Sequence, residues 1–302
     1  MTKTKTLLGA AVAFAALAAA APALAQDVKL GILGDITGPI ESLAPPIVAG
    51  AQLAFDHVNA QGGLLGGKIV TVTGDSACDP SVAGPAADKL VNTDQVTAMV
   101  GAFCTGATIG AATTAGIPGN VVQISPSASA PALTTLEDND LVFRTTPSDA
   151  FQGVKLADLL TAKGVTDVAL TYVNNDYGKG LADVFAAQFT KNGGTVAVNV
   201  AHEEGKADYR AELGQLAVSP NLVIIAYVSG SGLTILQQAN ESGNFTTYFG
   251  GDGMIGDALA GANVGNFIAT RAGAYAGESA DIYTKLATEA GQDPTATYAP
   301  QA

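Results

Sequence analysis

Short apolar runs alternate with segments of helical apolar spacing along most of the chain. Four to seven apolar residues in a row are typical of buried strands, whereas apolar residues every three or four positions indicate amphipathic helices. The expected strands are 28–33, 68–73, 99–100, 121–124, 167–172, 195–200, 222–226 and 247–249. The expected helices are 45–58, 81–91, 107–115, 151–162, 177–192, 209–216 and 233–241. Strict alternation of strand and helix predicts doubly wound parallel sheets, an α/β fold.

The pattern is interrupted once and then begins again. Phe143–Pro147 resembles a linker, because polar residues and a proline follow the first group of strands and helices. The second group is of similar size but shows no sequence repeat of the first. We therefore expect two lobes of parallel sheet, joined by a hinge and separated by a cleft.

Residues Met1–Ala25 have the features of an export signal. Lys3 and Lys5 precede the apolar stretch Leu7–Ala21, and small residues at Ala23 and Ala25 form a cleavage signature. The apolar stretch is shorter than the ~20 residues needed to span a bilayer. No cysteine follows the cleavage site, so a lipid anchor is not expected. The mature protein is therefore predicted to start near Gln26 and to be exported.

Charge and motif content argue against several classes of function. The chain carries 14 Lys and Arg against 27 Asp and Glu, so nucleic acid is not an expected partner. His57 and His202 belong to no HExxH motif, and no GxSxG is present. Residues 251–256 fit GxGxxG, but they lie far from the first strand that a dinucleotide site requires. We predict neither catalysis nor a metal or cofactor site.

Two expected strands end in loops of small and hydroxyl residues. Cys104–Thr108 follows the strand at 99–100, and Ser125–Ser129 follows the strand at 121–124. Ligands of parallel α/β sheets bind beyond the carboxyl ends of strands, where backbone N–H groups favour an anion. Two such loops side by side suit a small carboxylate. The alternative interpretation is that both are ordinary turns, since Ser and Gly commonly mark turns.

Cys78 and Cys104 are the two cysteines of the chain. In an exported protein such a pair is most simply a disulfide. A redox-active or metal-binding pair is the alternative, but no CxxC spacing and no neighbouring histidine supports it.

Several short motifs occur in an order that resembles one family. They are Thr37-Gly38-Pro39, Asn59-x-x-Gly62-Gly63, Asp75-Ser76-Ala77-Cys78-Asp79-Pro80, Ile124-Ser125-Pro126 and Tyr177-Gly178-x-Gly180. Together with Cys104 and the glycines around Asp252, they make the chain similar to the periplasmic leucine/isoleucine/valine-binding proteins of ABC transporters. The resemblance implies a type I periplasmic binding fold, monomeric and without a cofactor, that closes on its ligand and is recognised by a permease.

The resemblance also implies domain boundaries. After the signal segment 1–25, the N-terminal lobe comprises 26–146 and 275–302, and the C-terminal lobe comprises 147–274. The hinge crossovers fall near Arg144–Pro147 and Thr270–Ala274. Members of the family continue beyond the position that corresponds to residue 302, so the part that completes the C-terminal region is expected to be missing.

Ligand-binding residues are implied at the matching positions. Thr105 stands where a hydroxyl residue binds the ligand's α-carboxylate. The loop Ser127-Ala128-Ser129 matches backbone contacts to the carboxylate and the ammonium, with the Ser129 hydroxyl also used. Asp252 stands where the family has a Glu that pairs with the ammonium, and Tyr177 where a Tyr closes over the site.

Three departures from the family affect the expected ligand. Asp252 is shorter than the usual Glu, and Leu43 stands where leucine-binding relatives carry Trp. In the loop Tyr227–Gly230 the register suggests Val228 at an aromatic contact, with Tyr227 one place off, and both residues are expected at the site. The implied function is capture of an amino acid, branched-chain or related, for an ABC importer. Alternatives are a binding protein for amides, urea or small carboxylates, and a ligand-sensing subunit.

Overall fold

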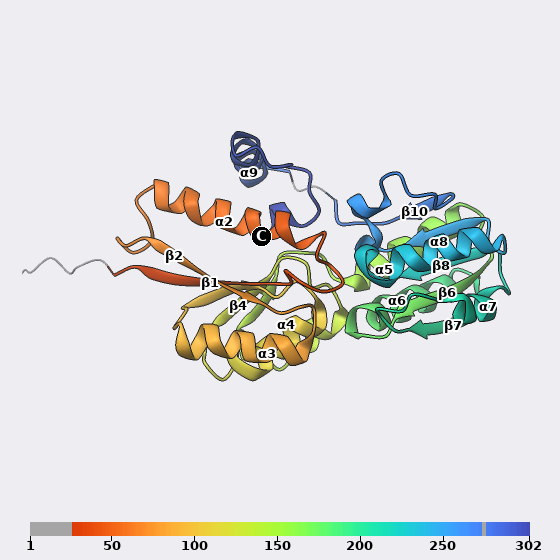
Figure 1. The fold of residues 1–302 in the computed structure, drawn as a ribbon, viewed down its shortest axis with the longest axis horizontal. Helices are drawn as coiled ribbons and strands as arrows, with labels where there is room; N and C mark the ends of the chain where they lie inside the picture. Colours follow the sequence, from red (N-terminus) through yellow and green to blue (C-terminus); the bar gives the residue numbers. More distant parts are fainter. Residues whose placement is uncertain (1–25, 274–275) are drawn as a thin grey trace, which may run out of the picture.

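Two parallel sheets with helices on both faces form the protein, as the alternating pattern predicted (Figure 1). The computed structural model describes residues 26–273 and 276–302. The predicted signal segment 1–25 and residues 274–275 of the second predicted crossover lie outside the described residues. The two five-stranded parallel sheets confirm the predicted two-lobed α/β fold class.

The first sheet has the strand order β2-β1-β3-β4-β5, and all its pairings are parallel. Its strands are β1 (Val28–Gly34), β2 (Ile69–Asp75), β3 (Ala98–Gly101), β4 (Val122–Ser125) and β5 (Val142–Arg144). Helix α2 (Ala44–Ala60), α3 (Pro80–Asp88) and α4 (Thr105–Ala111) cover it, and the last two continue into π turns at Lys89–Thr93 and Ala112–Gly116. A 3₁₀ turn at Pro131–Thr135 precedes β5.

The second sheet has the order β10-β9-β8-β6-β7 and is also parallel throughout. Its strands are β6 (Asp167–Val173), β7 (Thr195–His202), β8 (Asn221–Ile225), β9 (Thr247–Gly250) and β10 (Phe267–Ala269). The accompanying helices are α5 (Asp149–Ala162), α6 (Asp176–Lys191), α7 (Arg210–Leu216) and α8 (Leu233–Ser242).

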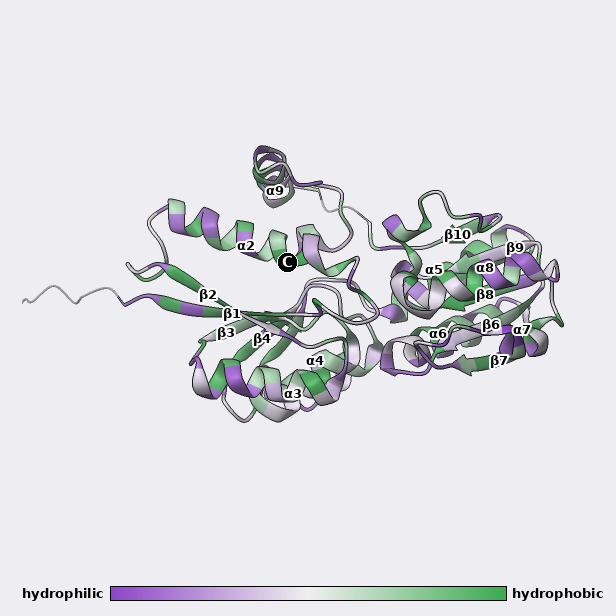
Figure 2. Cartoon of the chain, in the orientation of Figure 1, coloured by the Kyte–Doolittle hydropathy of each residue, from purple (hydrophilic) through white to green (hydrophobic). Residues whose placement is uncertain are grey.

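Burial accounts for the difference between the strand and helix patterns. In β8, four of the five residues are buried, because helices cover both faces of the sheet. Helix α8 instead buries Ile235, Leu236 and Ala239 on one side. Figure 2 shows the same contrast, with mixed polar and apolar colouring along helices such as α2 and α3.

The predicted linker at Phe143–Pro147 was wrong for its first two residues. Phe143 and Arg144 belong to strand β5, which pairs with β4 through Ile124↔Phe143 and Ser125↔Arg144. Three residues are too few for a strand periodicity to show in the sequence. The same reason explains why β10 was not predicted.

The last described segment returns to the first lobe. Helix α9 (Glu278–Glu289) lies beside α2 in Figure 1, and a 3₁₀ turn at Ala299–Gln301 packs against α2. A Cβ on Gly50 would lie 2.4 Å from the Ala299 carbonyl oxygen, so this approach requires glycine. The Thr145 hydroxyl also donates to the Gln301 carbonyl at 2.8 Å.

Candidate functional site

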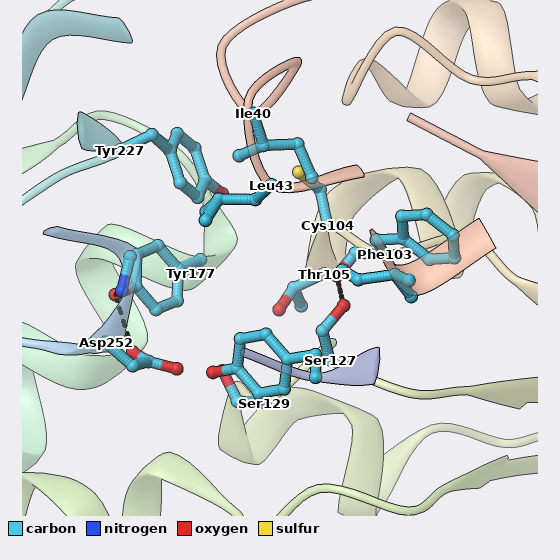
Figure 3. Close-up of a pocket in the computed structure, with 13 residues that line it drawn as sticks. Ile40, Leu43, Phe103, Cys104, Thr105, Ser127, Ser129, Tyr177, Tyr227 and Asp252 are labelled. Atoms are coloured by element: carbon cyan, nitrogen blue, oxygen red, sulfur yellow. Dashed lines mark hydrogen bonds between the residues drawn. The ribbon is translucent and has the colours of Figure 1, made fainter. Parts of the chain in front are cut away.

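A cleft between the lobes collects most of the residues that the sequence indicated (Figure 3). The first lobe contributes three hydroxyl side chains and an apolar wall, and the second lobe contributes two tyrosines and a carboxylate. The lining residues are Ile40, Leu43, Ile47, Phe103, Cys104, Thr105, Ser127, Ser129, Tyr177, Tyr227, Asp252, Gly253 and Tyr298. The two hydroxyl loops are therefore part of one cleft.

The loop before Thr105 is held by a buried carboxylate that sequence reasoning missed. Asp35 follows β1 and is fully buried. Its Oδ2 accepts from the N–H groups of Phe103 at 2.6 Å and Cys104 at 3.0 Å. Its Oδ1 accepts from the Cys78 N–H at 2.9 Å and from the Ser76 hydroxyl. One side chain thus fixes the ends of three neighbouring strands.

Burial and hydrogen bonding act in opposite directions on this group. Burial raises the pKa of Asp35 to about 6, although its four hydrogen-bond donors favour the charged form. The only signal for Asp35 in the sequence was its place directly after the first strand.

The predicted disulfide between Cys78 and Cys104 is confirmed. It joins the loop after β2 to the start of α4, with 5.3 Å between the two Cα atoms. Among the described residues, Asp35 and these two sulfurs form the one group of three side chains close enough to hold a metal ion. Because both sulfurs are committed to the disulfide, this group is not a thiolate metal site.

The three hydroxyl groups of the first lobe have different hydrogen-bond partners. Ser127 Oγ donates to the Phe103 carbonyl at 2.9 Å. Ser129 Oγ donates to Asp149 Oδ2 at 2.9 Å. Thr105 Oγ1 instead accepts from the Ala130 N–H at 3.3 Å.

The second lobe supplies a carboxylate that a tyrosine holds in place. Tyr177 Oη donates to Asp252 Oδ1 at 3.0 Å and accepts from the Gly253 N–H at 3.2 Å. Tyr177 also stacks on Tyr227, with 5.2 Å between ring centroids. Burial raises the pKa of Asp252, while the Tyr177 hydrogen bond acts against that rise. A hydrogen bond does not neutralise the charge of a buried carboxylate, so a cationic ligand group beside Asp252 is favoured.

Apolar side chains form the remaining wall of the cleft. Ile40, Leu43 and Ile47 come from the start of α2 and the turn before it. Tyr298 from the returning C-terminal segment adds an aromatic contact that the sequence did not indicate. Such a wall suits an apolar ligand group.

Two residues that the sequence placed in the site do not line this cleft. Ala128 and Val228 are both buried, but neither is among its lining residues. Tyr227 occupies the position at the cleft that the register had given to Val228. The backbone groups of Ala128 keep their predicted role as a proposal.

Asp149 is a site-proximal carboxylate that the sequence did not reveal. It is the first residue of α5, whose N-cap Ser148 accepts from the Ala150 N–H at 3.2 Å. The expected helix began two residues later, at Phe151, so Asp149 fell between the presumed linker, which ended at Pro147, and that helix. Burial and the nearby charge of Asp252 raise the pKa of Asp149 well above its ordinary value.

The lobes touch at the edge of the cleft. Ser229 Oγ donates to the Pro39 carbonyl at 2.9 Å and accepts from Ser42 Oγ at 2.9 Å. These bonds join residues about 190 positions apart in the chain, one from each lobe. The two lobes are therefore in direct contact beside the cleft.

Two parallel-sheet lobes closed over a cleft with both polar and apolar walls define a bilobed solute-binding protein. The family model described as periplasmic binding protein matches residues 27–301. The chain belongs to this family. In the described part of the chain, no helix is both long and apolar enough to cross a membrane.

Comparisons with individual proteins agree with the family. The chain is 33% identical over 258 residues to the Leu/Ile/Val-binding protein BraC3 of Rhizobium johnstonii, covering 84% of this chain and 67% of that protein. The solved branched-chain amino acid transporter substrate binding protein LivJ of Streptococcus pneumoniae, in complex with isoleucine, superposes with a TM-score of 0.79 at 26% identity. That match covers 91% of this chain and 80% of LivJ.

A further solved structure shares the fold with a different ligand. It is an ABC transporter solute binding protein of R. palustris in complex with benzoate, with a TM-score of 0.78 and 19% identity. The match covers 91% of this chain and 77% of that protein.

Proposed function

We propose that this protein is the solute-binding subunit of an ABC importer and that its ligand is an amino acid with an apolar side chain. The observation that carries the proposal is the division of polar groups between the lobes. Thr105, Ser127 and Ser129 of the first lobe face Tyr177 and Asp252 of the second. The names of the relatives, which bind leucine, isoleucine and valine, support the same ligand class.

The proposed binding mode answers both charges of a zwitterion. The ligand carboxylate binds at the Thr105 hydroxyl and at loop N–H groups, including that of Ala128. The ammonium pairs with Asp252, and the side chain lies against Leu43 and Tyr227. An unpaired buried charge costs several kcal/mol, on the order of 3–5, so a ligand that lacks either charge binds less well.

Binding on the first lobe and closure of the second complete the mechanism that we propose. The closed form, held by contacts such as Ser229 with Pro39, is then recognised by permease subunits in the membrane. We propose a monomer that acts in the periplasm after removal of 1–25, with the lobe boundaries given above. No step of this mechanism makes or breaks a covalent bond in the ligand.

A carboxylate without an amine is the second candidate ligand, because a protein of the same fold is solved with benzoate. The buried carboxylate of Asp252, which lines the cleft, and that of Asp149, which is bonded to the lining residue Ser129, disfavour such a ligand.

Isothermal titration calorimetry of the mature protein tests whether the ligand is an amino acid or a carboxylate without an amine. L-Leucine, L-isoleucine and L-valine are compared with 4-methylpentanoate, benzoate, acetamide and urea. We expect micromolar or tighter binding of at least one amino acid. Binding of a carboxylate or amide in the absence of any amino acid binding would overturn the proposed ligand class.

A further inference from the structure

We propose that Asp149 is a positioning residue that sets the polarity of the Ser129 hydroxyl, and that it thereby selects ligands with an ammonium. This inference rests on the proposed function and adds a residue that acts on the ligand through another side chain. It follows from the hydrogen bonds that Asp149, Ser129, Thr105 and Arg144 make around the cleft.

Asp149 and Ser129 are joined by two hydrogen bonds. The Asp149 N–H donates to the Ser129 carbonyl at 2.8 Å, and Ser129 Oγ donates to Asp149 Oδ2 at 2.9 Å. Asp149 is fully buried and Ser129 is 3% exposed, so water does not compete for these groups. The pair links the crossover into the second lobe to a residue that lines the cleft.

The bond from Ser129 determines what its hydroxyl offers to a ligand. A serine hydroxyl has one proton and two acceptor lone pairs. A charged carboxylate only accepts, so the proton of Ser129 is directed to Asp149 when Asp149 is ionised. The hydroxyl then presents only lone pairs to the cleft. The carboxylate of Asp252, another acceptor, lines the same cleft as Ser129. Two acceptors in one cleft favour a ligand group rich in N–H donors, such as an ammonium.

Thr105 has the opposite polarity. Its Oγ1 accepts from the Ala130 N–H at 3.3 Å, and among the described residues its own proton has no acceptor. The Thr105 hydroxyl is therefore free to donate to a ligand carboxylate. The Thr105 hydroxyl can donate to a carboxylate, and the Ser129 hydroxyl can accept from an ammonium. The two hydroxyls together therefore match the two charged groups of a zwitterion.

The charged groups near Asp149 carry an excess of negative charge, which favours a bound cation. The Arg144 guanidinium is hydrogen-bonded to the carbonyls of Ser129 and Ala130 and to the Thr134 hydroxyl, not to the carboxylate of Asp149. Asp149 Oδ1 is buried without a hydrogen-bond partner. A buried polar atom without a partner is uncommon and costly. A ligand ammonium near Ser129 compensates this excess of negative charge.

Asp149→Asn tests the inference, because the amide can turn its NH₂ toward Ser129 Oγ and release the hydroxyl proton into the cleft. The affinities of L-leucine and of 4-methylpentanoate, which is leucine without its amine, are measured by titration calorimetry. We expect the preference for leucine over 4-methylpentanoate to fall at least tenfold. Asp158→Asn, a change at a partly exposed carboxylate of the same helix α5 that does not line the cleft, is the matched control and should keep the preference.

Ser129→Ala separates positioning from a general structural role. If Asp149 acts through the Ser129 hydroxyl, Ser129→Ala lowers the same preference, and Asp149→Asn adds little to it in the double variant. Additive effects of the two substitutions would contradict the inference. If Asp149→Asn does not fold, the test rests on the preference of Ser129→Ala for leucine over 4-methylpentanoate. A preference equal to that of the wild type overturns the proposal.

The outcomes also distinguish this inference from the proposed function. Leucine binding by the wild type, with an unchanged preference in folded Asp149→Asn, overturns the role of Asp149 alone. Absence of binding by leucine, isoleucine and valine overturns the proposed function and, with it, this inference.

Discussion

Tyr177 donates its hydroxyl proton to Asp252 at 3.0 Å, and both residues belong to the second lobe. The phenol is buried and fixed by stacking on Tyr227. The carboxylate is therefore oriented before a ligand arrives, so little side-chain entropy is lost when it pairs with an ammonium.

Removing this carboxylate should affect zwitterionic ligands strongly. We expect Asp252→Ala to weaken leucine binding at least tenfold, because a buried ammonium loses its charged partner. Asp257→Ala, which removes an exposed carboxylate five residues later, is the control for calorimetry. Equal affinities of Asp252→Ala and the wild type would remove Asp252 from the ammonium site.

The contact between the lobes at Ser229 should stabilise the closed form. Ser229→Ala removes the donor to the Pro39 carbonyl, a bond worth about 1 kcal/mol. We expect about fivefold weaker ligand binding, mostly through faster dissociation in stopped-flow experiments. Ser42→Ala leaves the Ser229–Pro39 bond in place, so its effect should be smaller. Equal dissociation rates for Ser229→Ala and the wild type would show that this bond does not hold the closed form.

Ligand affinity should depend on pH. Burial raises the pKa values of Asp149 and Asp252, and the charge of Asp252 adds to the rise at Asp149. The Arg144 guanidinium acts against the rise at Asp149, and the Tyr177 hydroxyl acts against the rise at Asp252. A bound ammonium favours the charged carboxylates, so protons and ligand compete. We expect leucine affinity to fall as the pH is lowered from 7.5 to 5.

Asp252→Asn tests whether these two carboxylates cause the pH dependence of leucine affinity, because it removes one of them. Its remaining leucine binding should vary less with pH than that of the wild type. A wild-type affinity that is constant over this range would contradict the coupling.

Asp35 should make folding stability pH-dependent. Its pKa is raised from 3.8 to about 6 in the folded protein, so its contribution to stability is present below pH 4 and is lost as the pH rises through 6. The loss corresponds to about 3 kcal/mol. Asp35→Asn should flatten this part of a urea-unfolding profile, whereas exposed Asp88→Asn should not. A profile with the same slope in Asp35→Asn would assign the dependence to other groups.

The disulfide should contribute measurably to stability. A bridge between residues 26 positions apart contributes about 3 kcal/mol in the chain-entropy model. We expect Cys78→Ala/Cys104→Ala to unfold at lower urea concentration by a corresponding amount. The unfolded, unreduced wild type should show no free thiol, and two titratable thiols would contradict the bond.

Sequence patterns predicted the parts of the fold that depend on local periodicity. The longer strands were predicted because both faces of each sheet are covered, which leaves continuous apolar runs such as Leu222–Ala226. Strands β5 and β10 have three residues each, too few for a recognisable pattern. The hydroxyl loops of the site were found because small polar residues follow buried strands at the sheet edge.

Residues whose role depends on distant contacts were missed. Asp35 bonds to groups 41 to 69 positions away, and Asp149 bonds to Ser129 across the crossover. Nothing in the neighbouring sequence distinguishes either aspartate from a turn residue. The family register placed Val228 at the cleft, whereas the structure turns Tyr227 toward it, because a shift of one position in a loop is invisible without its backbone path.

The apolar wall of the cleft and its polar contacts are located on separate segments. Ile40, Leu43 and Ile47 come from one short stretch at the start of α2, whereas the polar side chains that line the cleft, Thr105, Ser127, Ser129 and Asp252, come from other segments. Substitutions at these three positions can therefore change the shape of the accepted side chain while the charged ends of the ligand stay bound. A small number of substitutions in this one segment would therefore alter the selectivity for the ligand side chain without altering the residues proposed to bind the charged groups.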